Sequence, residues 1–187
     1  MLYLLFSALI VIADQIVKRW AVLNLKGQGT KDFIPGILNL YYAENTGAAF
    51  SILRDQRWIF IIVSILASLV MVYIVLSKRI DSPLGLVPLS MVLGGAVGNL
   101  IDRIYAGFVV DMFEFAFIRF AIFNVADIFI TVGGVLFCVY YLYSETKNIK
   151  KQDSPGGSNT NTTEDLAGQD VIDEGKESCF SEGEENI

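Results

Sequence analysis

Histidine is missing from the 187-residue sequence, and cysteine occurs only twice. Without histidine, the chain cannot build a Ser-His-Asp or Cys-His catalytic system or a zinc site with histidine ligands. Cys138 and Cys179 form neither a metal-binding spacing nor a disulfide framework. Cys138 lies within an apolar run, where we expect a small buried side chain. We therefore expect no cofactor and no metal, and any catalysis must use carboxylates, amides, hydroxyls, lysine or arginine.

Charged residues are also scarce. They make up 18% of the chain, whereas 53% of it is hydrophobic. This composition is typical of an integral membrane protein. The net charge of −6 arises mainly from an acidic C-terminal segment. The sequence has no cluster of basic residues of the kind that binds nucleic acid, so we expect no nucleic-acid partner.

Four apolar runs are each long enough to cross a bilayer core of about 30 Å as a helix. They span residues 2–23, 58–77, 84–104 and 121–143. The first run has no basic segment before it and no small-residue cleavage site after it, so we expect a retained helix rather than a removable signal peptide. The pattern predicts an all-α membrane protein with four transmembrane helices.

Local signals indicate how these helices begin and pack. Ser82 is expected to cap the third helix, with Pro83 as its first residue. Gly94 and Gly98 form a small-residue face on which another helix can approach closely. We expect the same of Gly133 and Gly134 in the fourth helix.

The segments between the helices are short. Residues 24–36 are rich in turn formers, and residues 37–45 have the aromatic and β-forming residues of a short strand. We predict a small β-rich element on the membrane surface, and a further extended piece near Val109 and Val110. Residues 147–187 are acidic and poor in apolar residues, which predicts a disordered tail beyond a membrane domain of residues 1–146.

Several polar residues lie near the ends of the apolar runs. Asp14 and Lys18 are an i, i+4 pair, which either orients the first helix at the membrane edge or braces a site. Asp102 and Arg103 are neighbours that either form an ion pair at a helix end or belong to a site. Asn45 can cap a turn. Asn124 and Asp127 fall on one face of the fourth helix.

Asp111 and Asp127 are the main candidates for chemistry. A carboxylate beside a membrane-spanning helix is costly and marks a pathway or a reaction site. Four spans bring residues 24–56 and 105–120 to one side of the membrane, and both aspartates lie near that side. Two carboxylates that meet can share one proton and act as acid and base. Apolar neighbours should raise the pKa of Asp111.

Four motifs occur together with these spans, AENTGAAFS (43–51), GNLIDR (98–103), VVDMFEF (109–115) and FNVAD (123–127). In this order they resemble the lipoprotein signal peptidase (signal peptidase II) family, and DQIVK (14–18) is similar to that family's first-helix motif. The resemblance covers roughly residues 1–143. It implies a bacterial inner-membrane aspartyl endopeptidase that cuts a prolipoprotein before its diacylglyceryl-modified cysteine.

The same resemblance assigns roles to individual residues. It implies that Asp111 and Asp127 are the catalytic pair. It also implies a set of substrate-binding or supporting residues: Asp14, Lys18, Asn45, Gly47, Asn99, Asp102, Arg103 and Asn124. It implies cytoplasmic termini and a site near the outer face, where we also expect the β-rich element. We expect a monomer with membrane lipids as partners. Basic residues are too evenly divided between the two sides for the positive-inside rule to orient the chain.

A rival interpretation is a small transporter or proton relay that uses the same carboxylates. It predicts polar residues along both halves of the helix bundle. Here the polar residues gather at one end, and the run 58–77 carries no charge. A non-enzymatic scaffold would not need Asp127. Cleavage of a lipidated precursor by the purified protein separates these functions.

Overall fold

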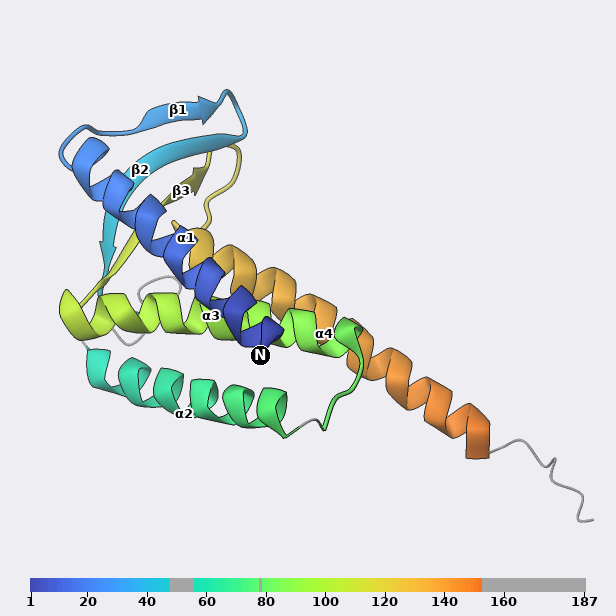
Figure 1. The fold of residues 1–187 in the computed structure, drawn as a ribbon. Coiled ribbons are helices and arrows are strands. Elements are labelled where there is room, and N and C mark those ends of the chain that lie inside the picture. The colour runs from blue at the N-terminus through green and yellow to red at the C-terminus, as the bar shows by residue number, and fades with distance from the viewer. Residues whose placement is uncertain (48–55, 78, 153–187) are drawn as a thin grey trace, which may run out of the picture. The chain divides into compact units, whose positions relative to one another are not determined.

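The computed structural model describes residues 1–47, 56–77 and 79–152. These described residues form four helices and three strands (Figure 1). The helices are α1 (Leu2–Asn24), α2 (Arg57–Leu76), α3 (Pro83–Tyr105) and α4 (Val125–Gln152). The strands are β1 (Lys31–Ile34), β2 (Leu38–Asn45) and β3 (Val109–Phe115). The predicted helical architecture with a small β-rich element is therefore confirmed.

The start of α3 agrees with the sequence prediction, whereas the start and the end of α4 do not. Ser82 caps α3 as expected, because its hydroxyl accepts a hydrogen bond from the Leu84 N–H and Pro83 follows it. The prediction that the fourth helix begins at residue 121 is wrong. Phe123 instead bridges to Phe113 of β3, so the helix begins at Val125. The helix then continues to Gln152, past the expected end at residue 143, and the remainder of the predicted tail lies outside the described residues.

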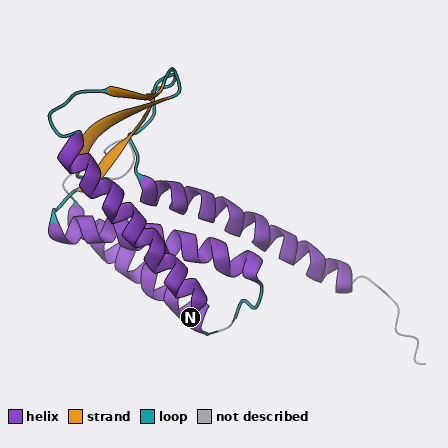
Figure 2. Ribbon diagram, turned by 45° about the horizontal axis from the view of Figure 1, so that its top comes forward, coloured by secondary structure: helices purple, strands orange, loops and turns teal. Residues whose placement is uncertain are grey.

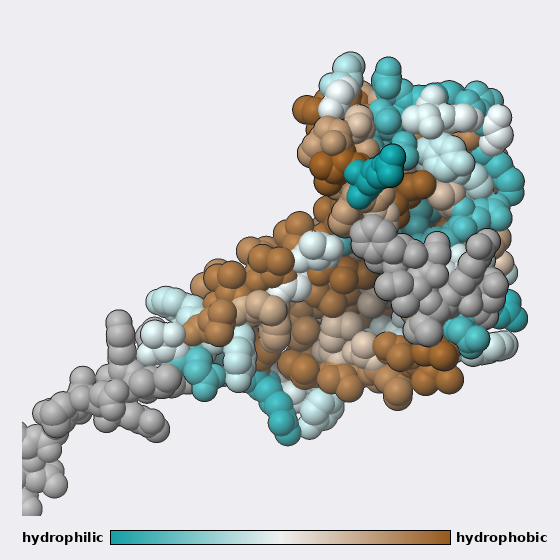
Figure 3. Space-filling model, turned by 180° about the vertical axis from the view of Figure 1, so that it is seen from behind, coloured by the Kyte–Doolittle hydropathy of each residue, from teal (hydrophilic) through white to brown (hydrophobic). Residues whose placement is uncertain are grey.

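Three helical segments of the described chain are long and apolar enough to cross a membrane. They are residues 57–76, 83–105 and 125–146. Helix α1 is of similar length, but it carries Asp14, Lys18 and Arg19. Hydrophobic residues cover most of the visible helical surface, and hydrophilic residues gather mainly at the sheet end (Figure 3). Cys138 is exposed on α4, so the expectation of a buried cysteine is wrong.

Helix α3 is the centre of the helical part and packs against α1, α2 and α4. Its glycines allow this. A Cβ atom on Gly94 would lie 2.9 Å from the Ser7 carbonyl oxygen of α1, and one on Gly98 would lie 2.6 Å from Asp14 Oδ2. Gly133 of α4 similarly lies against the Pro88 carbonyl, whereas Gly134 has no such neighbour. The predicted close packing is thus confirmed for Gly94, Gly98 and Gly133 and wrong for Gly134.

The strands form one antiparallel sheet in the order β1-β2-β3, at one end of the helices (Figure 2). Strand β2 occupies the segment predicted to be extended, and β1 lies in the preceding segment, for which the sequence indicated turn formers and no particular strand. The sheet packs against the C-terminal end of α1 through a buried apolar cluster made of Ala21, Leu25, Leu40, Val110 and Met112. The bridge between Phe113 and Phe123 places β3 beside the segment that leads into α4.

Candidate active site

Asp127 is held in the first turn of α4 by a reciprocal pair of bonds with Asn124. The Asn124 side chain accepts a hydrogen bond from the Asp127 N–H at 3.0 Å, and Asp127 Oδ2 accepts one from the Asn124 N–H at 3.1 Å. This is the geometry of a capping box, in which two otherwise unpaired N–H groups of a helix start are satisfied. The position of the carboxylate is therefore fixed by the helix start itself.

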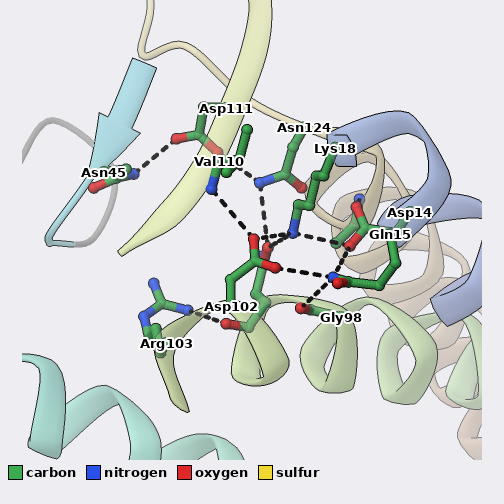
Figure 4. Close-up of polar contacts among 12 residues, drawn as sticks. Asp14, Gln15, Lys18, Asn45, Gly98, Asp102, Arg103, Val110, Asp111 and Asn124 are labelled. Atoms are coloured by element: carbon green, nitrogen blue, oxygen red, sulfur yellow. Dashed lines mark hydrogen bonds and ion pairs between the residues drawn. The ribbon is translucent and has the colours of Figure 1, made fainter. Parts of the chain in front are cut away.

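Asp111 comes from β3 and is 2% exposed. Both of its oxygens accept hydrogen bonds from asparagine amides, Oδ1 from Asn124 Nδ2 at 2.6 Å and Oδ2 from Asn45 Nδ2 at 2.9 Å (Figure 4). Asn45 also caps a turn as expected, because its Oδ1 accepts a bond from the Gly47 N–H. Asn124 thus contacts both aspartates, Asp111 by its side chain and Asp127 by its backbone and side chain.

The environment of Asp111 favours its protonated form. Burial raises its pKa first, and the nearby negative charge of Asp127 raises it further. The bonds from Asn45 and Asn124 and the charge of Lys18 act in the opposite direction but do not cancel these effects. The pKa of Asp111 is raised from 3.8 to about 6, in the direction that its apolar neighbours predicted.

Asn99 of α3 links Asp127 to Lys18 of α1. Its Nδ2 donates to Asp127 Oδ1 at 2.8 Å, and its Oδ1 accepts bonds from Lys18 Nζ at 2.8 Å and Asn124 Nδ2 at 3.2 Å. A lysine ammonium is only a donor, so it can bond only the oxygen of the amide. The orientation of Asn99 toward Asp127 is therefore set by Lys18 and Asn124 together.

Lys18 also forms two buried ion pairs. Its Nζ lies 2.9 Å from Asp14 Oδ2 and 2.9 Å from Asp102 Oδ2. The remaining oxygens are satisfied, since Asp14 Oδ1 accepts the Ala126 N–H of α4 at 2.9 Å. Both Asp102 and Lys18 are almost fully buried, so their charges must be paired and hydrogen-bonded if the network is not to be strongly destabilising. The prediction that Asp14 and Lys18 pair is confirmed, and their pair extends into the bundle rather than standing alone.

Asp102 and Arg103 point to different partners. Asp102 pairs with Lys18 and also accepts a hydrogen bond from the Val110 N–H of β3. Among the described residues, Asp102 and Arg103 therefore do not form the ion pair with each other that was one of the two expectations. The Arg103 guanidinium donates to the Gly47 carbonyl at 3.2 Å and the Asn99 carbonyl at 3.3 Å, and it lies over the Phe60 ring. Arg103 therefore connects the end of β2 with α2 and α3.

Gln15 is a member of the network that sequence analysis did not include among the site residues. Its Nε2 donates to Asp102 Oδ1 at 2.9 Å and to the Gly98 carbonyl at 3.2 Å (Figure 4). The available signal was its position next to Asp14 in DQIVK. Its partners lie on another helix, so only the packing of α1 on α3 reveals the contact.

A cavity of about 470 Å³ opens beside the two aspartates. Its polar lining residues include both aspartates, Asn45, Asn99 and Arg103. Apolar residues of β3, of the segment before α4 and of α4 line the rest, among them Phe115, Ile122 and Val132. The arrangement places two carboxylates, with amide donors around them, at the wall of a mostly apolar cavity near the end of the helices.

This combination of apolar helices with a buried and a half-buried aspartate at one cavity defines a class, that of membrane-embedded proteins with carboxylate acid–base chemistry. The family model described as signal peptidase (SPase) II matches residues 6–143. A lipoprotein signal peptidase of Clostridioides difficile (strain 630) is 41% identical over 148 residues, which cover 79% of this chain and 99% of that protein. The lipoprotein signal peptidase of Enterococcus faecalis is 42% identical over 143 residues, covering 76% and 89%.

Two solved structures share the fold, and each is described as a bacterial membrane enzyme. One superposes with a TM-score of 0.72 at 29% identity and covers 83% of this chain and 93% of its own. The other has a TM-score of 0.68 at 32% identity and covers 75% and 92%. The chain belongs to the signal peptidase II family, the aspartic peptidases that remove signal peptides from prolipoproteins. It is thus an integral membrane hydrolase of the bacterial cell membrane, and family membership decides against the transporter interpretation.

Proposed function

We propose that Asp111 and Asp127 are the catalytic pair of this intramembrane endopeptidase, and that it cleaves immediately before the diacylglyceryl-modified cysteine of a prolipoprotein. The observation that carries the proposal is the position of Asn124. It bonds both carboxylates, at 2.6 Å on the Asp111 side and 3.1 Å on the Asp127 side. Both aspartates also line the same cavity, so a peptide bond within it can reach both.

The surroundings favour different roles for the two carboxyl groups. Asp127 accepts hydrogen bonds from N–H donors at both oxygens, and in this proposal it is the general base. The raised pKa of Asp111 suits a general acid. Asp127 takes a proton from water as the oxygen attacks the scissile carbonyl, and Asp111 gives its proton to the leaving nitrogen. The C–N bond then breaks to leave one new carboxyl group and one new amine.

The other residues form two groups in this proposal. Asp14, Lys18, Asn99, Asp102 and Asn124 position the carboxylates from α1, α3 and the start of α4. Asn45 and Arg103 line the cavity, and Gly47, just after the end of β2, is hydrogen-bonded to both. The Arg103 guanidinium has five N–H donors in all and uses two of them in the bonds described, so others are available to substrate carbonyl oxygens.

We further propose that α1 is a fourth span. Its 23 residues are about 34 Å long at 1.5 Å per residue, which matches a bilayer core. Asp14 and Lys18 are buried and paired rather than facing lipid. Exposed apolar side chains such as Leu5, Leu9 and Ile12 cover the side of α1 that faces away from the other helices. Four spans put both termini on one side of the membrane. We propose that this side is the cytoplasm and that the sheet and the cavity lie at the outer face of the inner membrane.

The proposed substrate fits the apolar character of the cavity. A diacylglyceryl chain and a signal-peptide helix are both lipid-soluble, so they can reach a cavity at the membrane edge laterally. The protein acts as a monomer in this proposal.

The test compares two precursors that differ only in the diacylglyceryl group on the cysteine. Purified protein in detergent is incubated with each, and mass spectrometry identifies the new N-terminus. We expect cleavage before the modified cysteine and little cleavage of the unmodified precursor. Cleavage at another bond, or equal cleavage of both precursors, would contradict the proposed specificity.

A further inference from the structure

A second hollow of about 410 Å³ lies next to the cavity that holds the aspartates. It is lined by Asn39 of β2 and by consecutive residues of the end of β3 and the loop after it: Glu114, Phe115, Ala116, Phe117, Ile118, Arg119 and Phe120. None of these residues belongs to the candidate spans 57–76, 83–105 and 125–146. The cavity with the aspartates, in contrast, includes residues of α3 and α4.

Two aromatic rings separate the two hollows. Phe115 and Phe120 line both, and their ring centroids are 5.8 Å apart in an edge-to-face arrangement. A substrate peptide that passes over these two rings therefore runs directly from the cavity with the aspartates into the second hollow. The direction is from the membrane-spanning part of the molecule toward the sheet.

The chemistry of the second hollow suits a peptide backbone. Asn39 and Glu114 face each other across β2 and β3, and Arg119 lies in the loop beside them. Among the described residues, Asn39 Oδ1 is buried and accepts no hydrogen bond. A buried acceptor without a partner destabilises the free protein, and a bound N–H group removes that cost.

We propose that this second hollow binds the first residues after the cleavage site, the start of the mature lipoprotein. Asn39 Oδ1 accepts a backbone N–H of that segment, and Arg119 donates to one of its carbonyl oxygens. The proposal rests on the proposed function, because it takes the cleaved bond to lie beside Asp111 and Asp127. It adds a subsite for the polar part of the substrate, on the side of Phe115 and Phe120 away from the spans.

The test uses two lipidated precursor peptides with the same signal sequence. The short peptide ends at the modified cysteine as a carboxamide, and the long peptide continues for about five residues, a length that covers the hollow at roughly 3.3 Å per residue. Cleavage of both is measured with the wild-type protein, Asn39→Leu and Arg119→Gln. Leucine is similar in size to asparagine but has no acceptor, and Arg119 is exposed and lies outside the strands.

We expect the wild-type protein to have a lower KM for the long peptide. Each substitution should raise the KM for the long peptide by about three- to tenfold relative to the short one, the loss of one hydrogen bond. Lys31→Gln is the matched control, since it removes an exposed charge from the same hairpin outside the hollow. It should leave the ratio of the two KM values unchanged.

Equal KM values of the wild-type protein for the two peptides, or equal effects of both substitutions on the two peptides, would overturn the subsite. Failure of the proposed function has a different result, because the wild-type protein would then cleave neither lipidated peptide. If Asn39→Leu folds poorly, the Arg119→Gln ratio alone decides the question.

Discussion

Lys18 Nζ donates a hydrogen bond to Asn99 Oδ1 at 2.8 Å, and the other end of the same amide donates to Asp127 at 2.8 Å. Lys18 of α1 thereby helps to orient the Asn99 side chain of α3, so that its nitrogen rather than its oxygen reaches the Asp127 carboxylate of α4. The bond joins three helices at one point, so the geometry of the proposed catalytic pair depends on the packing of α1.

Replacing Lys18 with methionine tests this dependence. The change keeps the apolar stem but leaves Asp14 and Asp102 without their cation, and loss of one partner of a buried ion pair destabilises by about 3–5 kcal/mol. Misplacement of Asn99 and Asp127 should lower kcat by roughly 100-fold with a smaller effect on KM. Thermal unfolding in detergent and steady-state kinetics measure the two effects.

A purely structural role for Lys18 would not change the pH profile. Because the charge of Lys18 lowers the pKa of Asp111, Lys18→Met should shift the alkaline limb of activity to higher pH. Lys26→Met is the control, since Lys26 forms an exposed pair with Glu44 that contributes little to stability. An unshifted profile in folded Lys18→Met would contradict the electrostatic link.

The raised pKa of Asp111 also predicts how stability depends on pH. In the folded protein Asp111 keeps its proton up to about pH 6, whereas 3.8 is its ordinary pKa, so the folded state binds more protons between these values. The contribution of Asp111 is therefore most favourable below pH 3.8 and is lost as pH rises through about 6. Unfolding in detergent across this range should show the decline, and Asp111→Asn should remove it.

The glycines of the helix contacts provide a matched pair of substitutions. A methyl group on Gly98 would lie 2.6 Å from Asp14 Oδ2 and must displace that carboxylate, whereas one on Gly134 has nothing within 4 Å. Gly98→Ala should lower the unfolding temperature and the activity together. Gly134→Ala should be neutral or slightly stabilising, because alanine favours helix by about 1 kcal/mol over glycine. Similar effects of both would show that α1 does not pack on α3 in this way.

Thiol and metal reagents should have little effect on turnover. Cys138 is exposed on α4, and the described residues contain no group of three or more side chains suited to hold a metal. Alkylation of the protein, Cys138→Ala and addition of a chelator should each leave the rate within a few-fold. Complete inhibition by a chelator would require a different mechanism.

Much of the fold could be predicted from the sequence because its signals are local. The apolar runs, the Ser82-Pro83 start of α3 and the extended residues of β2 need only neighbouring residues. The start of α4 was misjudged because apolar residues before Asn124 fit a helix equally well, and the bridge between Phe113 and Phe123 is a tertiary contact. The Asn-x-x-Asp spacing of residues 124–127 was the local signal that could have placed it.

Partners across helices could not be predicted from spacing alone. The i, i+4 pair of Asp14 and Lys18 was visible in the sequence, but its extension to Asp102 depends on how α1 packs on α3. The exposure of Cys138 could not be predicted either, because it also depends on how the helices pack. An apolar run of the fourth helix is buried on one face only, and the sequence does not reveal which residues face lipid.

The central claim is that Asp111 and Asp127 act as one catalytic unit, and kcat of the asparagine variants tests it most directly. Asparagine keeps the shape of aspartate but does not exchange a proton at this position. Asp111→Asn and Asp127→Asn should each lower kcat by roughly 1,000-fold or more, and the double variant should be hardly worse than either. Near-normal turnover of folded, membrane-inserted Asp111→Asn would contradict the claim, and Asp102 would then be the first partner of Asp127 to test.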